Sequence, residues 1–296
     1  MLAKATGYPA HAFIPDLEDS VPDHAKEAAR SAVAAAIPAL AASGCSVIPR
    51  LNSPDTGLFE LDLEAVAGPQ IAGISVGKIR SPEEVRRIDT LLGRLEIRRG
   101  IPTGAIGILP WIETAAAVAR AVDVCRSSSR IRWVAFGAED LTVDMGIPRA
   151  SDQGRAPGGD DSSREASIGS SIEPLVSYAR AAVAIAARAA GAPAFDTPYV
   201  HFKDEAGLVR ETANARMLGF KGKFAIHPAQ LGPINRAFAP TEAEVSRARK
   251  VIDAWEAAAS QGRGAISLDG EMVDVPVVAR ARALLREAGT DGAGQR

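Results

Sequence analysis

The sequence has little cysteine and no excess of positive charge. Cys45 and Cys125 are the only cysteines in 296 residues, too few for a disulfide framework or a metal cage of sulfur ligands, so we expect a reducing compartment. The formal net charge is −2. This balance argues against a nucleic-acid-binding protein, because such proteins usually carry a basic face.

Long apolar runs are also lacking. The most apolar stretch, residues 181–194 (AAVAIAARAAGAPA), contains Arg188 and follows Arg180, so it is too short and too charged to span a bilayer. No charged and then apolar leader precedes the first acidic cluster. We therefore expect a cytoplasmic protein that binds neither membranes nor nucleic acids.

Short apolar segments, each bounded by turn or polar residues, alternate with helix-like segments along most of the chain. Continuous apolar strands that alternate with helices indicate a parallel sheet covered by helices. The helix-like segments often open on Ser, Thr, Asp or Pro and close on Gly, as capped helices do. The seven expected strands lie within residues 11–19, 46–52, 71–79, 105–114, 131–141, 193–200 and 222–228.

Seven strands fit an open sheet or a closed barrel that lacks one strand. No glycine-rich phosphate turn follows any of them, which disfavours a doubly wound nucleotide-binding sheet. A (β/α)₈ barrel needs eight strands in roughly 250 residues. Residues 1–10 (MLAKATGYPA) resemble the tail of a helix, so we predict an α/β (β/α)₈ TIM barrel over residues 1–240 whose first strand lies ahead of Met1. Without that strand the barrel has two unpaired edges.

The pattern changes near residue 241. Thr241 and Glu244 have the spacing of a helix capping box, and Asp269-Gly270 is typical of a hairpin turn between short strands. A final helix follows. We predict a C-terminal helix–hairpin–helix extension over residues 241–296 that packs on the barrel and on a neighbouring subunit.

Nearly every expected strand ends in polar or charged residues. In a barrel these ends converge on one mouth, where the active site lies. Several carboxylates facing one basin suit a hard cation such as Mg²⁺, which usually takes one or two protein carboxylates and keeps positions for water and an oxygen-rich substrate. The alternative is that each acid only caps the helix that follows it. The strand-end residues are Asp16, Glu18, Asp19, Arg50, Asn52, Lys78, Glu113, Thr114, Glu139, Asp140, Asp196, Thr197 and His227.

These residues belong to longer motifs, which are DLEDSVPDHAKEAAR, PRLNSPDTG, ILPWIETAAAV, FGAEDLTVDMG, DTPYVHFKDEAGL, GFKGKFAIHPAQL and GEMVDVPVVARA. In this order, from about residue 4 to residue 285, they resemble successive motifs of the citrate lyase beta-subunit-like branch of the HpcH/HpaI aldolase family. The resemblance implies a (β/α)₈ barrel that forms homotrimers or hexamers. It also implies Mg²⁺-dependent making or breaking of carbon–carbon bonds between a CoA thioester and a 2-oxo acid.

The resemblance assigns roles to the acids of the strand ends. Glu113 and Asp140 match the two metal ligands of the family. Glu18 and Asp19 match acids that hold metal-bound water, so they would orient the metal site without touching the ion.

Four further residues match substrate-side or catalytic positions. Arg50 matches the arginine beside the substrate carbonyl, and Lys78 and His227 lie where the family contacts substrate or CoA. Asp274 matches an acid that reaches into the site of a neighbouring subunit. Two of them have structural alternatives: His227, before a proline, is typical of a hydrogen-bonded structural residue, and Asp274, followed by Pro276, is typical of a helix cap.

The chemistry of these residue types suits the cleavage of a 3-hydroxyacyl-CoA. Mg²⁺ would lower the pKa of the substrate hydroxyl. Arg50 would stabilise the oxygen that becomes a carbonyl, and Asp274 is the candidate proton donor to the enolate carbon next to the thioester carbonyl.

Three functions remain open. The first is a Mg²⁺-dependent lyase acting on malyl-CoA-like or citramalyl-CoA-like esters, the second is a thioesterase that releases a hydroxy diacid and free CoA, and the third is a non-catalytic subunit of a lyase complex. Residues 150–171, which follow the FGAEDL segment, are polar, and we expect a mobile surface insertion there. At the mouth of a barrel such an insertion would alter substrate preference.

Overall fold

The computed structural model describes residues 5–147, 161–260 and 264–289, and for residues 161–175 it describes the backbone only. The chain divides into two compact units, residues 1–237 and 238–296. Each unit is described by itself.

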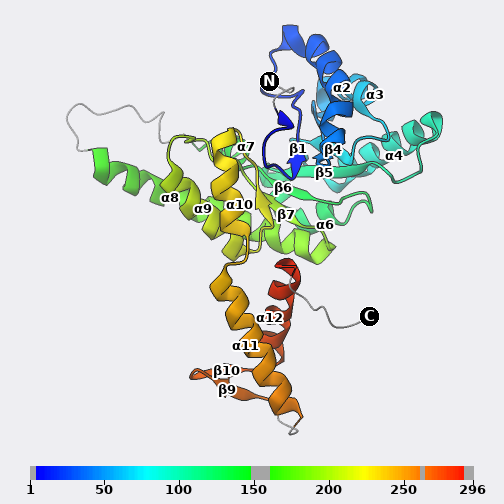
Figure 1. Ribbon diagram of the computed structural model, residues 1–296. Helices are drawn as coiled ribbons and strands as arrows, with labels where there is room; N and C mark the ends of the chain where they lie inside the picture. Colours follow the sequence, from blue (N-terminus) through cyan, green and yellow to red (C-terminus); the bar gives the residue numbers. More distant parts are fainter. Residues whose placement is uncertain (1–4, 148–160, 261–263, 290–296) are drawn as a thin grey trace. The chain divides into compact units, whose positions relative to one another are not determined.

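Parallel strands, paired in chain order, form the sheet of the first unit (Figure 1). They fall in the seven predicted segments, so this part of the prediction is confirmed. Helices connect them, as parallel pairing requires. The strands are β1 (Ala12–Phe13), β2 (Ser46–Val47), β3 (Arg50–Leu51), β4 (Gly73–Val76), β5 (Gly107–Ile112), β6 (Val134–Phe136), β7 (Ala194–Asp196) and β8 (Gly222–Lys223).

The first two segments pair over a longer stretch than the strand bounds suggest. Pro49, which has no N–H to donate, separates β2 from β3. The pairing continues past it, because the Arg50 N–H donates to the Pro15 carbonyl and the Leu17 N–H donates to the Arg50 carbonyl, both at 2.9 Å. Asp16 and Arg50 are therefore ladder partners as well as strand-end residues.

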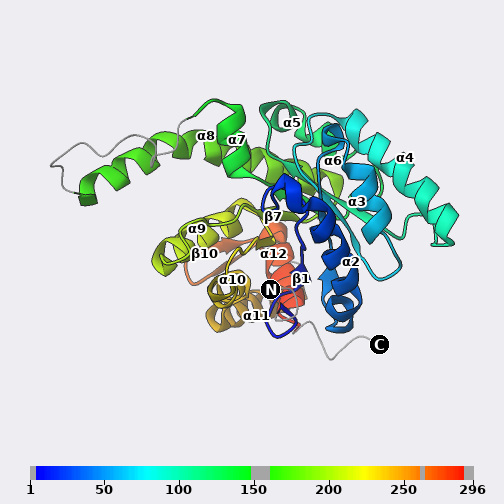
Figure 2. The same ribbon diagram turned by 90° about the horizontal axis from the view of Figure 1, so that it is seen from above.

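The connecting helices lie outside the sheet and follow one another in chain order from α2 to α9 (Figures 1 and 2). Neighbours along this series are in contact: α2 with α3, α4 with α6, α6 with α8, and α8 with α9. In the described residues no helix is both long and apolar enough to cross a membrane. The helices of this series are α2 (Lys26–Ala42), α3 (Phe59–Val66), α4 (Pro82–Arg99), α5 (Ala115–Ala119), α6 (Ala121–Cys125), α7 (Ala138–Asp144), α8 (Asp161–Ala190), α9 (Glu205–Leu218) and α10 (Leu231–Phe238), with 3₁₀ turns at Asp23–Ala25, Pro54–Thr56 and Pro228–Gln230.

The strands are buried along almost their whole length, which explains their continuous apolar sequence. Every residue of β4, β5 and β6 is buried. The Trp111 ring stacks on Phe224 at a centroid distance of 4.4 Å, and its indole N–H donates to Ser75 Oγ at 2.7 Å. The one polar atom of this large side chain is thereby satisfied inside the core.

Strands β1 and β2 form a two-stranded sheet and β3 to β8 form a six-stranded one. The Asp16–Arg50 bridge joins the two, so that the first strand segment, which contains β1, and β8 lie at the two edges. Among the residues that the structure describes, no pairing joins these two strands. The α/β class and the parallel sheet are thus established. The strands β1 to β8 occupy seven segments, because β2 and β3 share one, and closure into a barrel by a further strand segment stays a prediction.

The polar segment over residues 150–171 is in part helical. Residues 150–160 lie outside the described residues, but residues 161–171 belong to α8. The expectation of a mobile surface insertion over residues 150–171 stays a prediction, and the structure adds that the backbone of residues 161–171 is helical. Arg164, Glu165 and Ala166 are strong helix formers, and polarity alone does not distinguish a helix from a loop.

The second unit contains α11 (Glu242–Ala259), the hairpin of β9 (Ile266–Leu268) and β10 (Glu271–Val273), and α12 (Val275–Glu287). The predicted capping box is present, since Thr241 Oγ1 accepts from the Glu244 N–H and Glu244 Oε2 accepts from the Thr241 N–H. Asp269 and Gly270 both have positive φ, 53° and 82°, as a tight hairpin turn requires. The unit has a core of its own, formed by Ala248, Val251, Val273, Val278, Ala281 and Leu285.

Candidate functional site

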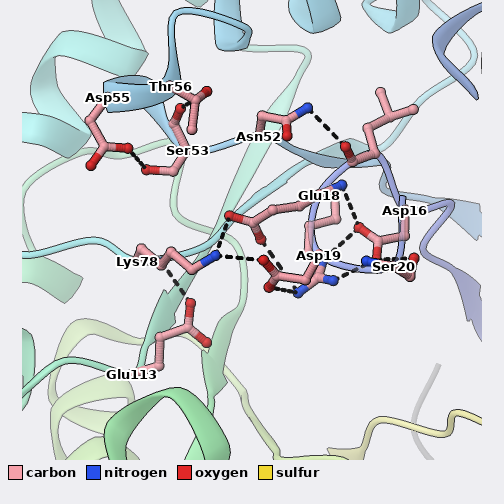
Figure 3. A network of polar contacts seen from close by, with 12 residues as sticks. Asp16, Glu18, Asp19, Ser20, Asn52, Ser53, Asp55, Thr56, Lys78 and Glu113 are labelled. Carbon is pink, nitrogen blue, oxygen red and sulfur yellow. Dashed lines mark hydrogen bonds and ion pairs between the residues drawn. The ribbon is translucent and has the colours of Figure 1, made fainter. Parts of the chain in front are cut away.

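Charged residues from four neighbouring strand ends meet in one network (Figure 3). Glu18 and Asp19 follow the first strand segment, Arg50 lies on β3, and Lys78 and Glu113 follow β4 and β5. Parallel strands place their carboxyl ends at the same edge, which is why residues so far apart in sequence meet here.

Arg50 is held by Asp16. Its Nε donates to Asp16 Oδ1 at 2.7 Å and its Nη2 to Asp16 Oδ2 at 2.5 Å, a two-point pairing that fixes the guanidinium plane. Burial alone would raise the pKa of Asp16, but the hydrogen bonds and charge of Arg50 outweigh it and lower this pKa to about 2. Nη1 makes only longer contacts, 3.4 Å to Glu18 Oε2 and 3.5 Å to Asp19 Oδ2.

Lys78 contributes through both its side chain and its backbone. The ammonium lies 2.7 Å from Asp19 Oδ1 and 3.3 Å from Glu18 Oε1. The Lys78 N–H donates to Glu113 Oε1 at 2.6 Å. Lys78 has a φ of 57°, in the left-handed region that residues other than glycine seldom adopt.

Glu113 is almost fully buried, with 2% of its surface exposed. Burial raises its pKa to about 8, and the charges of Asp140 and Glu18 add to this effect, while the Lys78 hydrogen bond opposes it. Asp140 lies in the first turn of α7, directly after β6. Its pKa is also raised, first by burial and then by the charge of Asp19. Burial and the neighbouring acids thus both disfavour the charged forms of Glu113 and Asp140.

This donor set fits a hard divalent cation held partly by water and substrate. Within the described ranges, no three His, Cys, Asp or Glu side chains are grouped so that they could hold an ion together. Glu113 and Asp140 could supply the one or two carboxylates that Mg²⁺ usually takes from a protein. Glu18 Oε2 is buried and accepts no hydrogen bond, so it has capacity for a metal-bound water.

A buried lysine fixes the turn that carries Glu18. Lys26 Nζ donates to the carbonyls of Leu17 and Glu18, at 2.8 and 2.7 Å, and to Asn52 Oδ1 at 2.7 Å. The Asn52 amide nitrogen in turn donates to Asp62 Oδ2 at 2.6 Å. These contacts satisfy the buried ammonium and hold the acidic turn against β3.

Sequence reasoning missed this supporting group. Lys26 and Asp62 were not assigned to the site, and Asp16 was recognised as part of the acidic cluster but not as the partner of Arg50. The available signal for Asp16 was its place at the end of a strand next to the strand that carries Arg50. For Lys26 the only signal was its position in the DHAKEAAR motif.

Asp196 belongs to a different network. Arg180 Nε donates to Asp196 Oδ1 at 2.9 Å, and Lys223 Nζ donates to Asp196 Oδ2 at 2.6 Å. Both groups also contact Glu211. This strand end is therefore committed to a buried ion-pair network beside β7 and β8.

His227 is a hydrogen-bonded structural residue, which was the alternative to a role in substrate binding. Its Nδ1 accepts from the Ala229 N–H at 3.2 Å and so caps the 3₁₀ turn that follows. Its ring also stacks on Phe202 at 5.2 Å. A hollow of about 490 Å³, lined by Val200, His201, Phe202, Lys203 and Asp204, lies on the same loop after β7 and does not include the acidic strand ends.

Asp274 caps α12 in the second unit. Its Oδ1 accepts from the Val277 N–H at 3.3 Å, so the helix-cap alternative is confirmed. Its neighbours Met272 and Val275 are largely exposed, at 70% and 64%. A role of Asp274 in a site stays a prediction.

The fold and the strand-end network define an α/β protein whose parallel sheet carries an acidic site with a fixed arginine. The chain belongs to the HpcH/HpaI aldolase/citrate lyase family, whose model matches residues 1–228.

Known proteins of similar length resemble this chain. It is 35% identical to citrate lyase subunit beta of Escherichia coli K12 over 292 residues, 99% of this chain and 90% of that protein. It is 30% identical to L-malyl-CoA/beta-methylmalyl-CoA lyase of Cereibacter sphaeroides over 279 residues, 92% of this chain and 86% of that protein. A solved structure of CitE from Mycobacterium tuberculosis in complex with magnesium, acetoacetate and coenzyme A superposes with a TM-score of 0.73 at 28% identity, covering 97% of this chain and 92% of that one.

Proposed function

We propose that this protein is a Mg²⁺-dependent carbon–carbon lyase. It cleaves a 3-hydroxyacyl-CoA such as malyl-CoA or citramalyl-CoA into an acyl-CoA and a 2-oxo acid, or forms the ester from these two compounds. The observation that carries the proposal is the meeting of the buried Glu113 with the guanidinium of Arg50 and the acids Glu18 and Asp19 at one sheet edge. The malyl-CoA lyase named above and the magnesium and coenzyme A bound to the CitE structure support it.

Glu113 and Asp140 would hold the metal ion, and Glu18 and Asp19 would hold water bound to it. Mg²⁺, when bound, supplies a Lewis acid that lowers the pKa of the substrate hydroxyl. The buried Glu18 Oε2, which accepts no hydrogen bond and lies 3.4 Å from Arg50 Nη1, supports the water-holding role.

Arg50 would bind the oxygen that becomes the carbonyl of the 2-oxo acid. Asp16 occupies Nε and Nη2, which orients the plane, whereas Nη1 has only the two longer contacts to acids and is the donor left for substrate. Permanent charge and fixed donor geometry make a guanidinium suited to stabilising a developing oxyanion. Lys78, half-buried and adjacent to Asp19, would bind an anionic part of the substrate.

Asp274 would donate the proton to the α-carbon of the thioester, the carbon that loses its bond to the 2-oxo acid, from the second unit of a neighbouring subunit in a homo-oligomer. The exposed apolar side chains beside it, Met272 and Val275, support an intersubunit position because they form a surface that another chain could cover. Trimers or hexamers, and closure of the sheet into a (β/α)₈ barrel by an eighth strand, are part of the same proposal.

Product analysis tests the proposed reaction. Purified protein is incubated with malyl-CoA or citramalyl-CoA, with Mg²⁺ or with chelator, and products are identified by mass, with Glu113→Ala as the inactive control. A 2-oxo acid and an acyl-CoA that form only with Mg²⁺ would support the lyase. A hydroxy diacid and free CoA would identify a thioesterase instead, and full activity in excess chelator would refute the metal role. Mg²⁺ binding without turnover of any ester would favour a non-catalytic subunit.

A further inference from the structure

The carboxylate of Glu113 lies between two glycines that end the neighbouring strands. Gly77 follows β4 and Gly137 follows β6, on either side of β5. A Cβ added at Gly77 would stand 2.9 Å from Glu113 Oε1 and 2.8 Å from Glu18 Oε2. A Cβ added at Gly137 would stand 2.2 Å from Glu113 Oε2. Any side chain at either position would therefore displace the carboxylate.

The backbone does not require glycine at these positions. Gly137 has φ −115° and ψ 104°, an extended conformation open to every residue. Gly77 is not among the glycines with positive φ. The space beside Glu113 is thus the physical reason for a glycine at both strand ends.

A backbone N–H forms the third boundary of the space that holds the Glu113 carboxylate, besides Gly77 and Gly137. Lys78, in its left-handed conformation, donates to Glu113 Oε1 at 2.6 Å. A non-glycine residue holds such a conformation only where its surroundings impose it. This hydrogen bond holds Glu113 Oε1 beside the end of β4. Glu113 Oε2 lies against Gly137, and Gly137 is the residue before α7, the helix that carries Asp140.

We propose that Gly77, Gly137 and the Lys78 N–H form a slot, here called the glycine slot, that positions the Glu113 carboxylate for the ion. The three are positioning groups that act through Glu113. The consequence for metal affinity rests on the proposed function, whereas the packing of Glu113 in the glycine slot does not.

A double-mutant cycle in the metal-free protein tests the packing. Thermal unfolding is compared for the unsubstituted protein, Gly137→Ala, Glu113→Gly and the double variant. We expect Gly137→Ala to lower the melting temperature clearly when Glu113 is present and to change it little in the Glu113→Gly background, because the carboxylate and the Glu113 Cβ, which would stand 2.7 Å from the added Cβ, are then both absent. Gly68→Ala is the matched control, since a Cβ at Gly68 would meet open space. Equal losses in both backgrounds would overturn the glycine slot.

Calorimetric titration with Mg²⁺ tests positioning. Gly137→Ala and Gly77→Ala should each raise the Mg²⁺ dissociation constant at least tenfold, whereas Gly68→Ala should change it by less than twofold. Unchanged Mg²⁺ affinity in folded Gly137→Ala and Gly77→Ala proteins would refute the positioning role. If Gly137→Ala does not fold, its double variant with Glu113→Gly should fold, and failure of both would contradict the slot. A parent protein that does not bind Mg²⁺ would refute the proposed function, while the unfolding cycle would still decide the packing.

Discussion

Replacing Glu113 with glutamine should stabilise the metal-free protein at neutral pH, although it alters the centre of the site. The pKa of Glu113 is raised from an ordinary 4.5 to about 8. Between these values the folded protein keeps a proton that the unfolded chain has released. The free energy of unfolding therefore falls as the pH rises through this window, and glutamine, which does not titrate, removes that loss.

The magnitude follows from the width of the window. pH 7 lies about 2.5 units above the pKa of Glu113 in the unfolded chain. At roughly 1.4 kcal/mol per unit, the free energy of unfolding is lowered by on the order of 3 kcal/mol at this pH. Glutamine keeps the shape of the side chain and an oxygen that can accept from the Lys78 N–H, so the substitution should cost little packing. One kcal/mol shifts the melting temperature of a domain of this size by about 2–4 °C, so a gain of several degrees is expected.

Thermal unfolding with chelator between pH 4.5 and pH 8.5 measures this effect. The curves of the parent protein and Glu113→Gln should nearly coincide at the acid end and separate as the pH rises. Added Mg²⁺ should raise the melting temperature of the parent at pH 8 and leave the variant unchanged, because a ligand stabilises only the form that binds it. Glu60→Gln, at an exposed position of α3, is the control and should show no such separation. A variant that is no more stable than the parent at pH 8, or a gap that narrows with rising pH, would refute the reasoning.

Three further experiments test other parts of the structure. Arg50→Lys should lower turnover by orders of magnitude without unfolding the protein, because an ammonium lacks the planar donor pair; near-normal turnover would make Arg50 only a charge partner of the acids. Glu113→Ala and Asp274→Ala proteins, each inactive, should regain activity when dissociated and reassembled together if the site is shared between subunits; no recovery in mixed oligomers confirmed by mass would argue for a site within one chain. Lys223→Met should lower the free energy of unfolding in urea by on the order of 3 kcal/mol, since it removes one of the two cations that balance the buried Asp196, and a loss below about 1 kcal/mol would contradict that account.

The strands and the helix caps could be predicted because their signals are local. Seven apolar runs identified the strand segments, and the spacing of Thr241 and Glu244 identified a helix start. The meeting of Glu18, Lys78 and Glu113 could also be predicted, because the carboxyl ends of parallel strands share one edge.

The partners of these side chains could not be predicted from the sequence. The first strand end alone supplies three candidate acids for Arg50, and only the register of the first two strand segments selects Asp16. Gly77 and Gly137 look like ordinary strand-end glycines, because the side chain that needs their space lies on another strand. Asp196 ended a strand like the other acids, yet the cations beside it come from α8 and β8.

The pairing of Asp16 with Arg50 has a consequence for folding. These two residues are opposite one another in the backbone ladder and are also joined through their side chains. A slip of one residue between the two strand segments would turn one of these side chains to the other face of the sheet and break the ion pair. A chain that holds its arginine correctly has therefore also aligned its first strands correctly, so a molecule with these strands out of register would lack a competent site.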